Sequence, residues 1–133
     1  MKNFNAKIKM IVADENGELK NKTQEYLVNS YSFTDAELVL AEKLDGYNYE
    51  LTNLAIKKFD EIHKGEFDYY FKVVVKHTMI DEEKGKEVKT NSNILISAND
   101  TEHANQLIKD IWSESVSNWE IKSISQTNYF DIF

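Results

Sequence analysis

Residues 26–36 read YLVNSYSFTDA, an apolar strand pattern that leads directly into a capped helix. Ser32 occupies the expected N-cap position and Asp35 follows three residues later, as in a capping box with Asp in place of the usual Glu. Residues 94–104, ILISANDTEHA, repeat this pattern with Asp100 in the place of Ser32. Two copies of a strand, cap and helix predict a fold built from an internal repeat.

The repeat extends before and after these two stretches. An alternation of apolar and polar residues precedes each copy, which is the period of a strand with one buried face. A turn with Asn16-Gly17 follows the first alternation, and a turn that ends at Gly85 follows the second. The buried positions expected in these strands are Phe4, Ala6, Ile8, Met10 and Val12 in the first half, and Phe71, Val73, Val75, His77 and Met79 in the second.

Each predicted helix has a mostly apolar stripe with the spacing of a helix that packs on a sheet. A further strand follows each helix, at Tyr49 and at Trp119, and both halves close on a similar short segment. The stripes are Ala36, Val39, Leu40, Lys43 and Leu44, and then Ala104, Leu107, Ile108, Ile111 and Trp112. The closing segments match as Phe59, Glu61, Ile62 and His63 against Tyr129, Asp131, Ile132 and Phe133.

These patterns predict an α+β fold, a tandem ββαβ repeat with mainly antiparallel sheets and two helices packed on them. We expect one domain, residues 1–133, made of the repeats 1–65 and 66–133. A single ββαβ unit of this size could hardly bury both faces of its sheet, so we expect the halves to pack about a pseudo-twofold axis.

Composition excludes several classes of function. The chain has 133 residues, a net charge of −7 and no cysteine, so disulfides and thiolate metal sites are excluded. All the basic residues are lysines, which removes bidentate recognition of phosphate by arginine. The sequence has no signal-peptide pattern and no apolar run of about 18 residues, so we expect a soluble cytoplasmic protein without membrane contact.

Part of the sequence resembles a known family. The resemblance rests on Phe4 to Lys7, on Tyr26-Leu27-Val28 followed by Ser32-Phe33-Thr34-Asp35-Ala36-Glu37, and on Phe59-Asp60-Glu61-Ile62. These residues are similar to an uncharacterised family of small Bacteroidota and phage proteins, a domain of unknown function of the DUF4494 type. The resemblance implies a phage or mobile-element setting, and it transfers no catalytic residue.

No active site is recognisable in the pattern of titratable residues. The histidines at 63, 77 and 103 have no metal-ligand spacing, and we expect a structural role for His77 on a half-buried strand and an exposed one for His103. The acidic run Asp81-Glu82-Glu83 lacks the spaced ligands and central glycine of a calcium loop. We therefore expect no metal site, no cofactor and no enzymatic activity.

Two binding hypotheses remain. In the first, lysines on the outer faces of the opening strands form one basic surface for single-stranded nucleic acid, with tyrosines nearby for stacking; the alternative for these lysines is that they keep the sheet soluble. The residues are Lys7, Lys9, Lys72 and Lys76.

In the second hypothesis, the chain is an acidic protein-interaction or inhibitor module for a host or phage protein, with homo-oligomerisation along edge strands as one form of assembly. Its contact residues would be Asp81, Glu82, Glu83 and the C-terminal Phe133, which either ends a free acidic-hydrophobic tip or packs against the fold.

Overall fold

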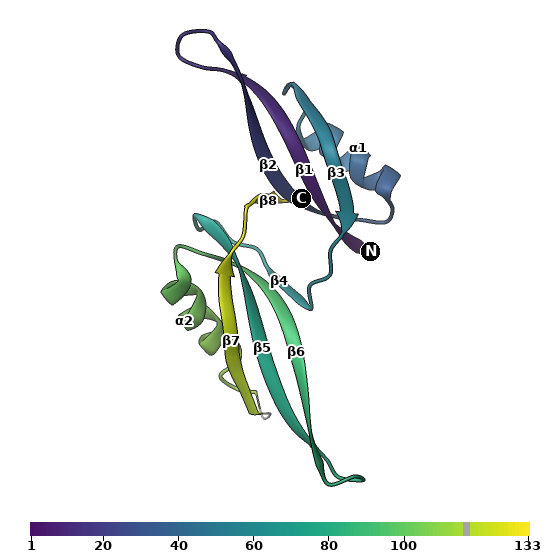
Figure 1. The fold of residues 1–133 in the computed structure, drawn as a ribbon, viewed down its shortest axis with the longest axis vertical. Helices are drawn as coiled ribbons and strands as arrows, with labels where there is room; N and C mark the ends of the chain where they lie inside the picture. Colours follow the sequence, from purple (N-terminus) through teal and green to yellow (C-terminus); the bar gives the residue numbers. More distant parts are fainter. Residues whose placement is uncertain (116–117) are drawn as a thin grey trace. The chain divides into compact units, whose positions relative to one another are not determined.

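The computed structural model describes residues 1–115 and 118–133. Two helices and eight strands confirm the predicted α+β class (Figure 1). In chain order, the elements are β1 (Lys2–Ala13), β2 (Leu19–Ser30), α1 (Phe33–Lys43), β3 (Tyr49–Ile56), β4 (Glu61–His63), β5 (Tyr69–Asp81), β6 (Lys86–Ala98), α2 (Thr101–Ile111), β7 (Asn118–Gln126) and β8 (Tyr129–Ile132).

The chain forms two compact units, each with its own four-stranded sheet. Unit 1 comprises Met1–Lys58 with Asn128–Phe133, and unit 2 comprises Phe59–Thr127. The strand orders are β3-β1-β2-β8 in unit 1 and β7-β5-β6-β4 in unit 2, and in each the last strand pairs in parallel while the others pair antiparallel. The two units therefore share one topology, and a pseudo-twofold axis between them stays a prediction.

The short strands β4 and β8 are exchanged between the two halves of the sequence. β4 follows β3 along the chain but pairs with β6 of unit 2, and β8 follows β7 but pairs with β2 of unit 1. The compact units consequently have different boundaries from the sequence repeats 1–65 and 66–133.

Chain connectivity explains this exchange. β3 is antiparallel to β1, as β2 is, so β3 runs parallel to β2. For β4 to pair in parallel with β2 of its own half, the chain would have to run back along β3 and cross to the opposite edge of the sheet. Only residues 57–60 separate β3 from β4, and four residues span at most about 14 Å. The even shorter segment 127–128 between β7 and β8 imposes the same restriction.

Each helix covers a face of its own sheet and closes a hydrophobic core. The buried residues of unit 1 are Phe4, Ala6, Ile8, Met10, Tyr26, Val28, Ala36, Leu40 and Leu44. Those of unit 2 are Phe71, Val73, Val75, Ile94, Ile96, Ala98, Ala104 and Ile108. These sets contain most of the positions expected from the strand and helix periods.

Three expected core positions are wrong, and two of them lie beyond the covered part of their unit. β3 pairs with β1 as far as Met10, and among the described residues β7 pairs with β5 as far as Thr78. Val12 and Met79 lie past these points on two-stranded ribbons and are exposed. Ile111, the last residue of α2, is exposed as well.

The helix caps show why both copies of the opening pattern fold alike. Ser32 Oγ accepts a hydrogen bond from the Asp35 backbone N–H (3.1 Å), and Asp35 Oδ2 accepts one from the Tyr31 N–H (3.1 Å). This is a capping box in which the return bond goes to the residue before the N-cap.

Within the described residues, no helix is long and apolar enough to cross a membrane.

The second cap corrects the expectation for His103. Asp100 Oδ1 accepts a hydrogen bond from the His103 N–H (2.7 Å), and His103 Nδ1 accepts one from the Asn99 N–H (3.0 Å). His103 thus takes the place of Asp35 in the cap, and its half-buried ring packs edge-on against Phe67 with centroids 4.5 Å apart. The histidine is a capping residue and not simply an exposed one.

Candidate functional site

The four lysines predicted to bind nucleic acid lie on the sheet faces that point away from the helices. Lys7 and Lys9 stand on β1 of unit 1, and Lys72 and Lys76 stand on β5 of unit 2, in alternation with the core residues. Each strand therefore places its own two lysines on one face of its sheet.

Carboxylates lie beside three of these lysines. Lys7 Nζ is 3.9 Å from Glu25 Oε1, and Lys76 Nζ is 3.5 Å from Glu120 Oε1. Lys9 is aligned with Glu50 of β3, whereas Lys72 is aligned with the uncharged Leu95 and Ser125. Surface ion pairs of this kind add little stability, but they place a negative charge where a phosphate would have to bind.

The predicted contact residues of the second hypothesis occupy two different environments. Asp81 ends β5, and Glu82 and Glu83 begin the turn that follows, where Asp81 Oδ1 accepts a hydrogen bond from the Glu83 N–H (3.0 Å). Phe133, in contrast, packs against the core of unit 1: its backbone bonds to Leu27 and Asn29 of β2. The C-terminal residue is therefore docked on the sheet and does not form a free tip.

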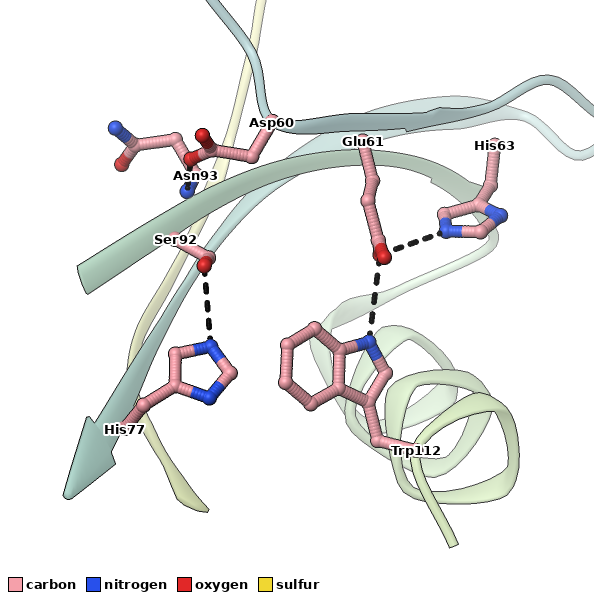
Figure 2. Close-up of polar contacts among 7 residues, drawn as sticks. All are labelled: Asp60, Glu61, His63, His77, Ser92, Asn93 and Trp112. Carbon is pink, nitrogen blue, oxygen red and sulfur yellow. Dashed lines mark hydrogen bonds and ion pairs between the residues drawn. The ribbon is translucent and has the colours of Figure 1, made fainter. Parts of the chain in front are cut away.

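A polar and aromatic network, absent from the sequence-based predictions, lies in unit 2 (Figure 2). Glu61 Oε2 of β4 accepts hydrogen bonds from Trp112 Nε1 (3.3 Å) and His63 Nε2 (3.2 Å). The Trp112 ring lies 4.6 Å from the His77 ring, and His77 Nε2 is 3.0 Å from Ser92 Oγ. These five residues, called the unit 2 network below, join β4, β5, β6 and the end of α2.

The backbone holds β4 firmly beside this network. Asp60 lies directly before β4, and its Oδ2 accepts a hydrogen bond of 2.6 Å from the Asn93 N–H; Figure 2 shows these two residues side by side. The Asp60 N–H also donates to the Asn93 carbonyl. The Trp119 ring packs edge-on against Trp112 with centroids 5.8 Å apart. Glu61 is consequently fixed where it can accept the indole hydrogen bond.

The Ser92–His77 contact resembles the nucleophile–base pair of a hydrolase. In a catalytic triad, a carboxylate orients the second nitrogen of that histidine. Here Glu61 bonds to His63 and Trp112 and not to His77, and the His77 ring packs against the Trp112 ring. The network therefore has the contacts of a structural cluster that locks β4 and α2 onto the sheet. Among residues 1–115 and 118–133, no three His, Asp or Glu side chains are grouped to hold a metal ion.

The corresponding place in unit 1 contains a pocket of about 350 Å³ that is open to solvent. Leu44 is the C-cap of α1 as Trp112 is of α2, and Met10 is aligned with Tyr49 as His77 is with Trp119. The lining residues are Met10, Val12, Lys22, Gln24, Tyr26, Lys43, Leu44, Tyr47, Phe130, Asp131 and Phe133. We call this the unit 1 pocket.

Aromatic rings form much of the wall of the unit 1 pocket. Tyr26 stacks on Phe133 with centroids 4.8 Å apart and meets Phe130 edge-on at 5.8 Å. The Tyr26 hydroxyl donates to Gln24 Oε1 at 2.6 Å. Burial raises the pKa of Tyr26, and Asp131 and Tyr47 raise it further, so Tyr26 remains a neutral hydrogen-bond donor at ordinary pH.

Sequence reasoning missed the unit 1 pocket because its walls come from distant segments. Phe130, Asp131 and Phe133 reach it only through the exchange of β8. The available signal is the alignment of Asp131 and Phe133 with Glu61 and His63, which indicates that the C-terminal segment packs on the fold but does not indicate what it packs beside.

The fold defines an α+β protein of two units that share one strand order and one pattern of parallel and antiparallel pairing. Residues 2–133 match the family described as Domain of unknown function (DUF4494), and the chain belongs to that family. Comparison with curated proteins and with solved structures found no match.

Proposed function

We propose that this chain is a non-enzymatic binding module whose partner is a protein. The observation that supports this proposal best is the β5–β6 ribbon, which comprises residues 79–88 and extends past Thr78, the last β5 residue that pairs with a described residue of β7 (Figure 1). On it, Met79 is 54% exposed, Ile80 71% and Val88 41%.

Both faces of this ribbon carry apolar surface. Met79 and Val88 are directly opposite each other in the register, so they share one face, and Ile80 points to the other. A two-stranded ribbon is marginally stable by itself, and apolar side chains on it gain free energy only when another surface covers them. Exposed apolar groups in a projecting element are typical of a protein-interaction site.

The ribbon also suggests the chemistry of the partner surface. Exposed carboxylates of Glu82 and Glu83 follow Ile80 and Asp81 at the tip. The β1–β2 ribbon, residues 11–21, has the same character, with Ile11, Val12 and Leu19 exposed near Asp14, Glu15 and Glu18. The partner surface that fits is an apolar patch bordered by lysine or arginine. The phage or mobile-element setting stays a prediction.

Single-stranded nucleic acid on Lys7, Lys9, Lys72 and Lys76 is the competing proposal. Binding to phosphates requires cationic side chains that displace counterions, and the net charge of −7 opposes it. Glu25 and Glu120 already lie beside Lys7 and Lys76. The geometry therefore favours a protein partner.

Site-specific photocrosslinking of the full chain tests the proposal. A benzophenone amino acid at Ile80 is compared with one at Leu38, which is similarly exposed at 64% but lies on α1. In nuclease-treated lysate of the source cells, we expect a discrete crosslinked protein from position 80 only. Replacement of Asp81, Glu82 and Glu83 by lysine should abolish it, because the charge complementarity is reversed.

Two results would contradict the proposal. One is equal crosslinking from positions 80 and 38, which would indicate non-specific contact. The other is anisotropy of a fluorescent oligonucleotide that rises with the wild-type chain and is lost in K7E/K9E/K72E/K76E, which would favour nucleic acid. A parallel reaction with purified protein alone shows whether the partner is a second copy of this chain.

A further inference from the structure

Charged and aromatic side chains outside the β5–β6 ribbon line the unit 1 pocket. It contains two lysines, Lys22 on β2 and Lys43 in the last turn of α1, and one carboxylate, Asp131. Within the described part of the chain, neither lysine makes an ion pair. Asp131 Oδ1 accepts a hydrogen bond from the Ile132 N–H (2.8 Å), which satisfies part of its negative charge. The pocket is therefore locally cationic on a protein whose net charge is −7.

The pocket also offers aromatic faces to a ligand. Phe130 and Tyr47 line it and are 63% and 62% exposed, whereas Tyr26 and Phe133 stack on each other deeper in the wall. Stacking of a planar base on an aromatic side chain contributes about 1–3 kcal/mol in nucleic-acid complexes. Exposed rings beside unpaired ammonium groups suit a planar ring that carries an anionic group.

Polar groups at the base of the pocket add hydrogen-bonding capacity. The Gln24 carbonyl oxygen is engaged by the Tyr26 hydroxyl, which fixes the side-chain amide and directs its N–H groups to other acceptors. The volume of about 350 Å³ lies at the lower end of the range for small-ligand sites. A ligand with one ring system and one phosphate fits these limits better than a larger cofactor.

We propose that the unit 1 pocket binds a nucleoside monophosphate, either free or as the phosphorylated end of a single strand, with the base on Tyr47 and Phe130 and the phosphate on Lys22 and Lys43. This inference is independent of the β5–β6 ribbon proposed above, since the pocket contains no residue of that ribbon. Unit 2 has Trp112 and His77 at the corresponding place, so we assign one such site to the chain.

Calorimetric titration of the full chain with adenosine 5′-monophosphate tests this site. Lys22→Glu and Lys43→Glu should each weaken binding about tenfold, because each replaces a charge-assisted contact to phosphate with a repulsive one. Lys89→Glu on β6 and Lys109→Glu in the last turn of α2 are matched controls at exposed positions of unit 2 and should leave the affinity within about twofold. Tyr47→Ser, which removes an exposed ring, should also weaken binding.

Titrations with other ligands distinguish a free nucleotide from the end of a single strand. Adenosine without phosphate and inorganic phosphate without base should each bind more weakly than the monophosphate. A 5′-phosphorylated thymidine hexamer that binds more tightly than the free nucleotide would identify the end of a single strand as the ligand. The proposal is overturned if millimolar monophosphate gives no binding heat, or if the unit 1 and unit 2 lysine variants lose affinity equally.

Discussion

The two units place different chemistry at one position of the same topology. In unit 2, Trp112 at the end of α2 reaches Glu61 of the exchanged strand, and the space is filled by packed rings and hydrogen bonds. In unit 1, the smaller Leu44 occupies the equivalent cap, and Asp131 replaces Glu61. The same backbone therefore holds a closed structural network in one unit and an open pocket in the other. Side-chain size at the helix C-cap explains much of this difference.

The largest effect on stability should come from substitutions in the two hydrophobic cores, which both units have. Phe4 and Phe71 are both 1% exposed and occupy matching strand positions. Phe4→Ala and Phe71→Ala should each lower the free energy of unfolding by about 3–5 kcal/mol, measured by urea titration with circular dichroism. Leu38→Ala, at an exposed helix position, is the control. A loss below about 1 kcal/mol at either phenylalanine would show that the cores are not equivalent.

A smaller effect should follow from giving unit 2 the cap residue of unit 1. Trp112→Leu removes the indole donor to Glu61 and the ring contacts with His77 and Trp119. We expect a loss of about 2 kcal/mol in unfolding free energy, from lost aromatic packing and the lost hydrogen bond to Glu61, which keeps its bond to His63. Trp112→Phe, which keeps a ring, should recover part of this loss. Equal stability of Trp112→Leu and wild type would argue that the network does not hold β4.

The helix caps should respond alike in both units. Ser32→Ala and Asp100→Ala each remove a side-chain acceptor from the N3 N–H and should cost about 1 kcal/mol. Thermal unfolding measures the change. Ser32→Asp, which places the acceptor of the second cap in the first, should retain nearly wild-type stability. If it did not, the caps would not be interchangeable.

An effect that depends on pH concerns β8, which forms part of the wall of the unit 1 pocket. Burial, together with the Glu25 carboxylate, raises the pKa of Tyr129 to about 12. The folded chain then holds the Tyr129 proton more tightly than the unfolded chain does. The protonated hydroxyl therefore contributes its full share to the free energy of unfolding below pH about 10, and this contribution is lost as pH rises towards 12. Urea titrations across this range should show a steeper fall for wild type than for Tyr129→Phe. Parallel curves would contradict the raised pKa.

Local sequence patterns predicted the elements and the cores well. Alternation around Ile8 and Val75 identified the buried strand faces, and Ser32 and Asp100 marked the helix starts, because these signals depend on neighbouring residues alone. The exchange of β4 and β8 depends on strand order, which local periodicity does not encode. The short segments 57–60 and 127–128 contained the missing signal, since neither is long enough to return the chain across its own sheet.

The candidate sites were less predictable for the same reason. Lys7 and Lys76 were recognised as outward-facing, but their glutamate neighbours come from paired strands that the sequence does not align. The unit 1 pocket requires Phe130 and Asp131 to lie beside Lys22 and Leu44, which follows only from the exchanged strand. The sequence pattern therefore predicts which face of the sheet each lysine lies on, but not which carboxylate lies beside it.

Residue-specific ¹H–¹⁵N spectra of the full chain, recorded with increasing adenosine 5′-monophosphate, test the contrast between the units most directly. We expect shifts of the Lys43, Tyr47 and Phe130 amides, with the Trp112 indole N–H unchanged because it remains bonded to Glu61. Shifts of the Trp112 indole and the His77 amide as large as those in unit 1 would contradict an open pocket in one unit and a closed network in the other.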